Sequence, residues 1–532
     1  MSFARKVYIS GLIFYCSLFS SGVLIFHYNP QTLLLMKRNH FPFLFSKRIV
    51  FFMFCLLIFM VGCQDKPVYL QPQSSPSIEA APWGVEFTVL PPHIGRYPDE
   101  LEHITQERID SVVDFASQLG IKWVRLSVDW ANVVDREGNY HWDQVDRIID
   151  GLVENKIEIA LCINGGHVKY TDRQAPVSAE AIEHWKDYVT VFVTRYKDKI
   201  THWELWNEPN TVWFWKPTPK AKDYVALMEE FHGIVKEIIP EARIIGGAMA
   251  RLDMEFADTI LQMGIDQYID AITYHPYNEI PEAMIRKIRV PARTPMWYVE
   301  SDHSIYEFRE MVDRADPGIE LWQGECGYPS EDNGSGWTGN GPWSPNIQAK
   351  WLLRRMLTDL SYNAEVIKYF CMVEYYTSRN VDEGTGVLNS KGLLTVNDLE
   401  AKPSFSAFQN LISVLNGQLS SGIAEDYEAE VLMDGSFHNV MQKNMMFLDI
   451  ENDRGQDFLA YWIVWRMQDM VENAAVNIQS NNKFEDPVLV NLLSGEVQKI
   501  KTKDQNDGQQ WMELPLADYP FIITSMNNLK TK

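Results

Sequence analysis

The chain has 532 residues and a formal net charge of −23 at pH 7, and aromatic residues make up 12% of it. This length allows a large core and more than one domain. The negative charge excludes a nucleic-acid-binding protein, which needs a basic surface. The 17 Trp and 23 Tyr residues suit the binding of flat apolar ligand faces such as those of pyranose rings, although most aromatic side chains fill cores.

Two apolar segments begin the chain, at residues 7–26 and 49–62. The second is shorter than the roughly 20 residues that span a bilayer, and it follows basic residues, as the core of a signal peptide does. It ends in Phe59-Met60-Val61-Gly62-Cys63, which resembles the lipobox of bacterial lipoproteins. That resemblance implies a signal region over 1–62, a lipid on Cys63 and attachment to a membrane of the bacterial cell envelope. Gln64 after the cysteine implies sorting to the outer membrane, facing either the periplasm or the cell surface.

Met36-Lys37-Arg38 has the composition of the basic start of such a signal. We therefore expect translation to begin at Met36, so that residues 1–35 are not part of the protein. A transmembrane helix over 7–26 is the alternative, because that segment is long enough to span a bilayer.

Residues 63–82 are rich in Pro, Gln and Ser and lack an apolar period, which predicts a flexible tether. Beyond them, apolar extended runs alternate with helical patterns up to residue 418. The expected strands are 83–89, 122–128, 157–163, 200–206, 242–247, 271–274, 320–324 and 366–373. The expected helices are 107–119, 142–155, 179–196, 224–239, 256–263, 304–314, 348–363 and 402–415.

Eight strand–helix repeats predict a (β/α)₈ TIM barrel over 83–418. A doubly wound open sheet is the alternative, and the lack of a Gly-rich turn after the first strand disfavours it. Residues 419–532 contain short apolar runs between turns rich in Asn, Asp and Gly, which predicts a small C-terminal β-sandwich.

Cys162, Cys326 and Cys371 each lie in or beside an apolar run, and we expect them to be buried free thiols. The Cys spacing resembles neither a metal site nor a disulfide framework. The His clusters of a metal-dependent hydrolase are also lacking, so we expect no metal and no cofactor.

The residues after the predicted strands carry the candidate chemistry, because a barrel's active site lies at the C-terminal ends of its strands. The fourth strand ends in Trp206-Asn207-Glu208-Pro209, which presents a carboxylate beside an amide. On its own this motif is also compatible with a capping turn and a surface glutamate. The other candidates lie in or follow strands two, six, seven and eight: Arg125, Trp130, His275, Tyr277, Glu325 and Glu374.

Trp206-Asn207-Glu208-Pro209 on strand four, Glu325 on strand seven, His275-Pro276-Tyr277 and Arg125 together resemble the retaining glycoside hydrolases of clan A. With the trailing β-domain, the sequence is most similar to family 39, which includes β-xylosidases, or to a neighbouring clan family. The resemblance implies Glu208 as acid/base and Glu325 as nucleophile. It implies Asn207 as the partner of the sugar 2-hydroxyl and Arg125 as a neighbour of the nucleophile.

The remaining site residues are less defined. Tyr277 would orient Glu325, and His275 would bind a sugar hydroxyl or the acid/base, with a buried structural role as the alternative. Arg125 also has a structural alternative, an ion pair with a barrel acid. Glu374 and Tyr375 compete for the place where the clan usually has an aromatic residue. Four tryptophans are expected either to stack on sugar rings or to pack their own loops: Trp213, Trp215, Trp337 and Trp343.

The expected function is therefore a retaining β-glycosidase that acts on oligo- or polysaccharides by double displacement. Two glutamates on opposite strands of one barrel are expected to stand about 5–5.5 Å apart. The alternative is a non-catalytic carbohydrate-binding lipoprotein on the same scaffold. The sugar, the linkage and endo or exo action depend on loop shapes, which the sequence does not define.

Overall fold

The computed structural model describes residues 4–9, 12–18, 24–27, 67–72, 81–88, 104–278, 280–285, 304–331, 343–377, 387–424, 426–432, 438–465, 474–481, 483–505 and 508–531. Met36, Cys63 and Trp337 lie outside these residues. The translation start, the lipidation site and the stacking role of Trp337 therefore stay predictions.

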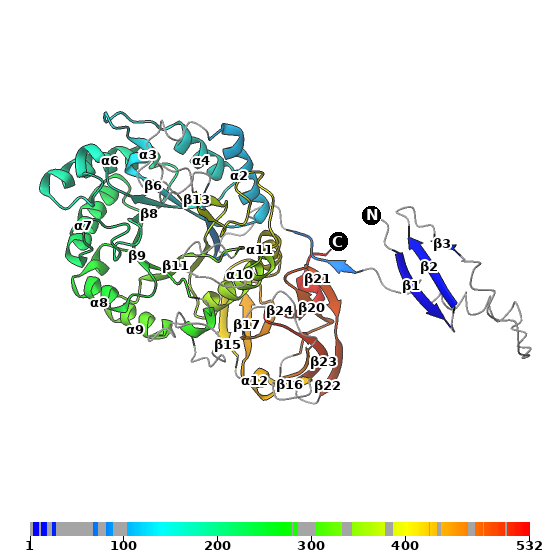
Figure 1. The fold of residues 1–532 in the computed structure, drawn as a ribbon. Coiled ribbons are helices and arrows are strands. Elements are labelled where there is room, and N and C mark those ends of the chain that lie inside the picture. The colour runs from blue at the N-terminus through cyan, green and yellow to red at the C-terminus, as the bar shows by residue number, and fades with distance from the viewer. Residues whose placement is uncertain are drawn as a thin grey trace, which may run out of the picture. The chain divides into compact units, whose positions relative to one another are not determined.

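Residues 1–66 and 67–532 form separate units. In the first unit, three strands form an antiparallel sheet (Figure 1): β1 (Ala4–Ile9), β2 (Leu12–Leu18) and β3 (Leu24–His27). The described residues within 7–26 are thus extended, where a transmembrane helix was the alternative prediction. Within the described parts of the chain, none of the helices is both long and apolar enough to cross a membrane.

Eight parallel strands of the second unit close into a barrel in the order β10-β11-β12-β5-β6-β7-β8-β9. The strands are β5 (Trp83–Glu86), β6 (Trp123–Asp129), β7 (Glu158–Asn164), β8 (His202–Leu205), β9 (Arg243–Ala250), β10 (Ala271–His275), β11 (Glu320–Cys326) and β12 (Val366–Tyr369). The predicted (β/α)₈ barrel is confirmed, with helices around its strands (Figure 1).

The major helices that cover the barrel also follow the prediction to within a few residues. They are α2 (Gln106–Leu119), α4 (Asp143–Glu154), α6 (Ala179–Tyr196), α7 (Ala221–Ile238), α8 (Met254–Gln262), α9 (Ile305–Ala315), α10 (Pro345–Leu360) and α11 (Pro403–Val414). In α2, Ile109, Val112, Val113, Ala116 and Leu119 recur at helical spacing and are buried. Such apolar stripes hold the helices against the sheet.

Strand eight is shorter than predicted, because β12 ends at Tyr369 rather than at residue 373. Beyond it, Tyr375–Thr377 (β13) pairs with Val387–Asn389 (β14) as a separate antiparallel ribbon. The apolar run continues past Tyr369 because Cys371, Met372 and Val373 are buried outside the barrel sheet. These three residues are therefore buried without belonging to the barrel sheet, and the apolar pattern alone does not distinguish them from strand residues.

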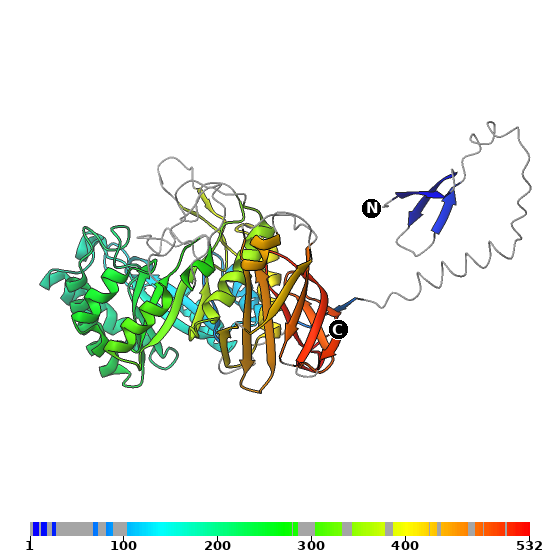
Figure 2. The same ribbon diagram turned by 90° about the horizontal axis from the view of Figure 1, so that it is seen from below.

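The predicted C-terminal β-sandwich consists of two sheets beside the barrel (Figures 1 and 2). The larger has the order β15-β17-β18-β24-β20-β21-β4, and the smaller has the order β16-β19-β23-β22. Their strands are β15 (Leu419–Ile423), β16 (Glu428–Leu432), β17 (Met445–Asn452), β18 (Asp457–Ile463), β19 (Ala474–Ser480), β20 (Pro487–Asn491), β21 (Glu496–Lys499), β22 (Lys501–Gln505), β23 (Gly508–Leu516) and β24 (Phe521–Ser525).

Strand β18 shows how the larger sheet is buried on both faces. Leu459 and Tyr461 belong to the core between the two sheets. Their neighbours Ala460 and Trp462 belong to the main core, which is continuous with the barrel. Because successive side chains of a strand point to opposite faces, a strand buried on both sides is apolar throughout.

One strand of the larger sheet comes from the segment predicted to be a flexible tether. Val68–Tyr69 (β4) pairs antiparallel with β21, and Leu70 forms a further bridge with Thr531. The prediction of an unstructured tether over 63–82 is therefore wrong for these residues. Their short pairing occurs through the backbone, which leaves no apolar period in the sequence.

A buried polar cluster holds the larger sheet to the barrel. Glu282, in the 3-10 helix η4 (Pro281–Met284), accepts two hydrogen bonds from Arg354 of α10, at 2.6 and 2.7 Å. The indole N–H of Trp462 in β18 donates to the same carboxylate at 2.7 Å. Because the carboxylate is fully buried, these donors replace its hydration. The cluster thus ties the loop after β10 to the C-terminal domain.

Candidate active site

Glu208 and Asn207 follow directly after β8, at the C-terminal end of the barrel. Glu208 has left-handed backbone geometry, with φ of 46°, and its backbone N–H donates to the carbonyl of Ala248 at 2.9 Å. The backbone N–H of Asn207 donates to Oδ1 of Asn164 at 3.1 Å. These contacts with neighbouring strands fix the turn that presents both side chains, as predicted from Asn-Glu-Pro.

Glu325 lies near the end of β11, and three predicted neighbours surround it. The hydroxyl of Tyr277 donates to Oε1 at 2.5 Å, and Nη1 of Arg125 donates to Oε2 at 3.2 Å. The Nδ1 atom of His275 lies 3.8 Å from Oε2. Both carboxylate oxygens thus accept hydrogen bonds from protein donors, which fix the orientation of the carboxyl group.

Glu208 and Glu325 face each other across the barrel mouth. Oxygen atoms of the two carboxyl groups and a ring nitrogen of His275 all lie within 4.8 Å of one another. The two side chains are 10% exposed each, so they are nearly buried but reach the surface. This separation is shorter than the span that two carboxyls need to hold a water between them.

Burial raises the pKa of Glu208 to about 7, although Arg125 and Arg251 oppose the shift. Glu208 therefore carries a proton in weakly acidic solution, as an acid catalyst requires. The main cause of the raised pKa is removal from water, because the side chain sits in a nearly closed site.

His275 is fully buried on β10, and its Nδ1 atom lies 3.0 Å from Oε1 of Glu208. Burial lowers the pKa of His275 to about 4, so the ring is neutral at weakly acidic and neutral pH. The predicted contact of His275 with the acid/base is present. A neutral ring can exchange a hydrogen bond with Glu208 without adding a charge to the site.

Arg125 projects from β6 into the barrel and contacts three carboxylates. Its Nε and Nη2 atoms bind Glu204 in a two-pronged contact at 3.0 and 2.7 Å, and Nη2 also donates to Oδ1 of Asn207 at 2.9 Å. Its Nη1 atom donates to Glu86 at 3.1 Å as well as to Glu325. Both predicted roles of Arg125, a site neighbour and a partner of a barrel acid, are therefore present together.

Sequence reasoning missed Glu86 and Glu204. Each is an isolated acid within an apolar strand, β5 and β8 respectively, and each is at least nine-tenths buried. A charged residue in a buried strand needs a partner of opposite charge. That pattern was visible in the sequence and would have directed attention to both residues.

Two predicted substrate-binding residues lie elsewhere. Trp130 is buried and stacks on Tyr170 and Tyr188, with ring centroids 5.4 and 5.0 Å away. Glu374 is buried in an ion pair with Lys402 at 2.6 Å. Both side chains have protein partners in this structure, and their contact with a sugar stays a prediction. The prediction for both rested on their place after a strand end, which does not define the direction of a side chain.

The residue directly after strand eight, which ends at Tyr369, is the aromatic Phe370. Its ring lies 6.5 Å from that of Tyr277 at an angle of 73°. Of the described loop tryptophans, Trp215 packs on Trp206 and Trp343 packs near Tyr328. Trp213 is 63% exposed and remains available for a ligand.

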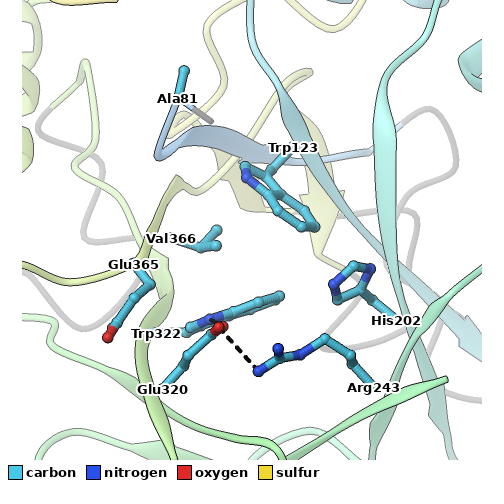
Figure 3. A pocket seen from close by; sticks show the side chains of 8 residues that line it. All are labelled: Ala81, Trp123, His202, Arg243, Glu320, Trp322, Glu365 and Val366. Atoms are coloured by element: carbon cyan, nitrogen blue, oxygen red, sulfur yellow. Dashed lines mark hydrogen bonds and ion pairs between the residues drawn. The ribbon is translucent and has the colours of Figure 1, made fainter. Parts of the chain in front are cut away.

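A cavity of about 170 Å³ opens at the other end of the barrel (Figure 3). Trp123, His202 and Trp322 line it together with an Arg243–Glu320 ion pair at 2.9 Å. These residues lie at or near the starts of their strands, whereas Glu208 and Glu325 lie at the ends. The three rings pack on one another, with centroids 4.9 to 5.7 Å apart. The cavity is thus separate from the catalytic candidates.

Glu208, His275 and Glu325 also have the atom types of a metal site. However, Arg125 and Tyr277 already donate to the two oxygens of Glu325, and a metal ion would have to sit beside a guanidinium cation. The surroundings of the three residues therefore suit proton transfer and sugar binding better than metal binding.

The sequence model of glycosyl hydrolases family 39 matches residues 101–443. The fold is similar to that of a family 39 glycoside hydrolase from the gut symbiont Bacteroides cellulosilyticus, with 16% identity and a TM-score of 0.57. The match covers 84% of this chain and 80% of that one.

Two further solved structures have similar folds at 14% identity. The family 39 enzyme from Xanthomonas axonopodis pv. citri matches with a TM-score of 0.53, over 87% of this chain and 98% of that one. A monomeric β-xylosidase from Caulobacter crescentus matches with a TM-score of 0.51, over 86% of this chain and 98% of that one. At such identities these likenesses show the fold alone.

Proposed function

Because the chain belongs to glycosyl hydrolase family 39, and so is a glycoside hydrolase, we propose that it cleaves β-linked glycosides with net retention of configuration. In this proposal Glu325 is the nucleophile and Glu208 is the acid/base. The observation that carries it is that one oxygen atom of each carboxyl group lies within 4.8 Å of an oxygen atom of the other. Retaining enzymes have a short separation of this kind, whereas inverting enzymes need roughly 6.5–9.5 Å for a water.

The first step is attack of the Glu325 carboxylate on the anomeric carbon. Arg125 and Tyr277 hold this carboxylate in position through hydrogen bonds to its two oxygens. At the same time Glu208 transfers its proton to the glycosidic oxygen, and the leaving group departs as an alcohol. The products are a glycosyl ester on Glu325 and an ionised Glu208.

In the second step Glu208 takes a proton from a water, which attacks the anomeric carbon and releases Glu325. Two features favour the ionised Glu208 that this step needs: Glu325 is neutral as an ester, and the departed leaving group admits water. Asn207, held by Arg125, lies beside Glu208 and is suited to bind the sugar 2-hydroxyl. Such a contact strengthens in the transition state.

The substrate class is carbohydrate, and a panel of aryl β-glycosides, with the β-xyloside first, is the direct screen. Proton NMR of the first-formed product, recorded before mutarotation, tests the mechanism. We expect the β-anomer from a β-glycoside. An initial α-anomer would refute retention, and a wild-type protein that binds sugars without cleaving any of the panel would favour the non-catalytic alternative.

We also propose a lipid anchor on Cys63 that holds the enzyme in the bacterial cell envelope, with the outer membrane as its expected site. The support is the basic, apolar and Gly-Cys pattern of the N-terminal sequence.

A further inference from the structure

A single nitrogen atom of Arg125 serves two acidic side chains. Nη1 lies 3.1 Å from Oε2 of Glu86 and 3.2 Å from Oε2 of Glu325. The other donors of the guanidinium are directed at Glu204, Asn207 and Cys162. Nη1 carries two hydrogens and donates to both carboxyl groups, so Glu86 is the side chain that shares this nitrogen with Glu325.

We propose that Glu86 is a positioning residue for the nucleophile: as a neutral acid it holds Nη1 of Arg125 within reach of Glu325, and as a carboxylate it attracts the guanidinium more strongly and weakens the contact with Glu325. This inference rests on the proposed retaining function. Glu86 is 4% exposed and acts through Arg125, so it is not itself a catalytic residue.

The charges already paired with Arg125 support a neutral Glu86. Arg125 makes ion pairs with Glu204 at 2.7 Å and with Glu325 at 3.2 Å. An ionised Glu86 would bring a third carboxylate charge to the same guanidinium, which is costly in a buried site.

The groups that face Glu86 come from several strands. Arg125 of β6 attracts its charge, while Glu325 of β11 and Glu204 of β8 repel it. Lys368 of β12 also acts on it, and Cys162, Cys371 and Tyr375 lie within electrostatic reach. Burial outweighs the attraction and raises the pKa of Glu86 to about 7, so Glu86 changes charge near neutral pH.

A Glu208→Gln variant isolates this effect when its substrate is a dinitrophenyl glycoside, whose leaving group needs no proton. The kcat/KM of this variant reports attack by Glu325 without titration of Glu208. We expect it to fall about three- to tenfold as the pH rises through 7, which is the scale of weakening one hydrogen bond to a charged group. The Glu208→Gln, Glu86→Gln double variant should lack this inflection, because Gln cannot ionise.

Glu86→Gln and Glu86→Ala in the wild-type background give a second readout. Gln still accepts from Arg125 and Ala does not, so Glu86→Ala should lose more kcat at every pH. The proposal is overturned if Glu208→Gln shows no inflection near pH 7, or if the inflection persists in the double variant. A wild-type protein that does not hydrolyse the dinitrophenyl glycoside at all would instead count against the proposed function.

Discussion

The substitution Trp462→Phe tests the polar cluster between the barrel and the C-terminal domain. It removes the indole N–H that donates to Glu282 at 2.7 Å, while Arg354 continues to bind the same carboxylate. A hydrogen bond to a charged group contributes about 1.5–3 kcal/mol, and the smaller ring adds a cavity cost. We therefore expect a clear fall in the free energy of unfolding, measured by urea denaturation and circular dichroism.

Trp511→Phe is the matched control. Trp511 is also fully buried, and its N–H donates at 2.9 Å to the neutral amide oxygen of Gln509. A neutral hydrogen bond contributes about 0.5–1.5 kcal/mol, and the cavity cost is similar for the two variants. The difference between them should thus be about 1 kcal/mol, with Trp462→Phe the less stable. If Trp462→Phe cost no more stability than the control, the role assigned to the hydrogen bond from Trp462 to the Glu282 carboxylate would be refuted.

The pH dependence of the stability loss separates the effect of the charge on Glu282 from the effect of the smaller ring at position 462. Burial opposes ionisation of Glu282, but Arg354 outweighs burial and the pKa of Glu282 lies below its ordinary value. The stabilisation is therefore complete above the ordinary pKa and is lost as the pH falls through the lower, folded value. The excess cost of Trp462→Phe should shrink over that acidic range, and the cost of Trp511→Phe should not follow it. The loop of Glu282 also carries Tyr277, so kcat should fall more in Trp462→Phe than in the control.

Three further predictions concern the site and the N-terminus. Glu325→Ala should abolish turnover, and added azide should then give a product of inverted configuration. Glu208→Ala should retain activity on substrates with good leaving groups, and added azide should give a product of retained configuration. If both variants responded alike, the two roles would be wrong. For a substrate with a poor leaving group, kcat/KM should fall as the pH rises through about 7. The reason is that Glu208 must be protonated to act as an acid, and burial raises its pKa to about 7. A kcat/KM that stays constant up to pH 9 would contradict this prediction. Mass spectrometry of the N-terminal peptide should find a lipid on Cys63, and an unmodified Cys63 would refute the lipobox assignment.

The barrel was predictable because each of its repeats carries two periodic signals. Helix α6 was predicted at residues 179–196 and spans Ala179–Tyr196. Strand eight was extended too far, because Cys371 and Val373 are apolar for reasons of burial outside the sheet. Strand β4 was missed, because two residues that pair through their backbone leave no period to detect.

The candidate site residues that belong to a recognisable motif were predictable, and those chosen only for their place after a strand were less so. Glu208, Glu325, Tyr277, His275 and Arg125 meet in one network. Trp130 and Glu374 also follow strand ends, yet their side chains turn into packed surroundings. The direction of a side chain after a strand depends on the local turn, which the sequence pattern does not encode. Glu86 and Glu204 are isolated acids in apolar strands, which the sequence shows, but only the structure shows that both contact Arg125.

The pairing of β4 with β21 also determines which contacts a pulling force on the N-terminal side of the folded unit would break first. Leu70 and Thr531 form a bridge, and the backbone N–H of Gln71 donates to the carbonyl of Lys530 at 2.8 Å. The two ends of the folded unit therefore leave from one edge of one sheet. A pull on an anchored N-terminus would act first on the two-residue strand Val68–Tyr69, whose detachment leaves all eight barrel strands in place. Because these ends are neighbours, a linker could join them in a circularly permuted chain whose new termini lie elsewhere.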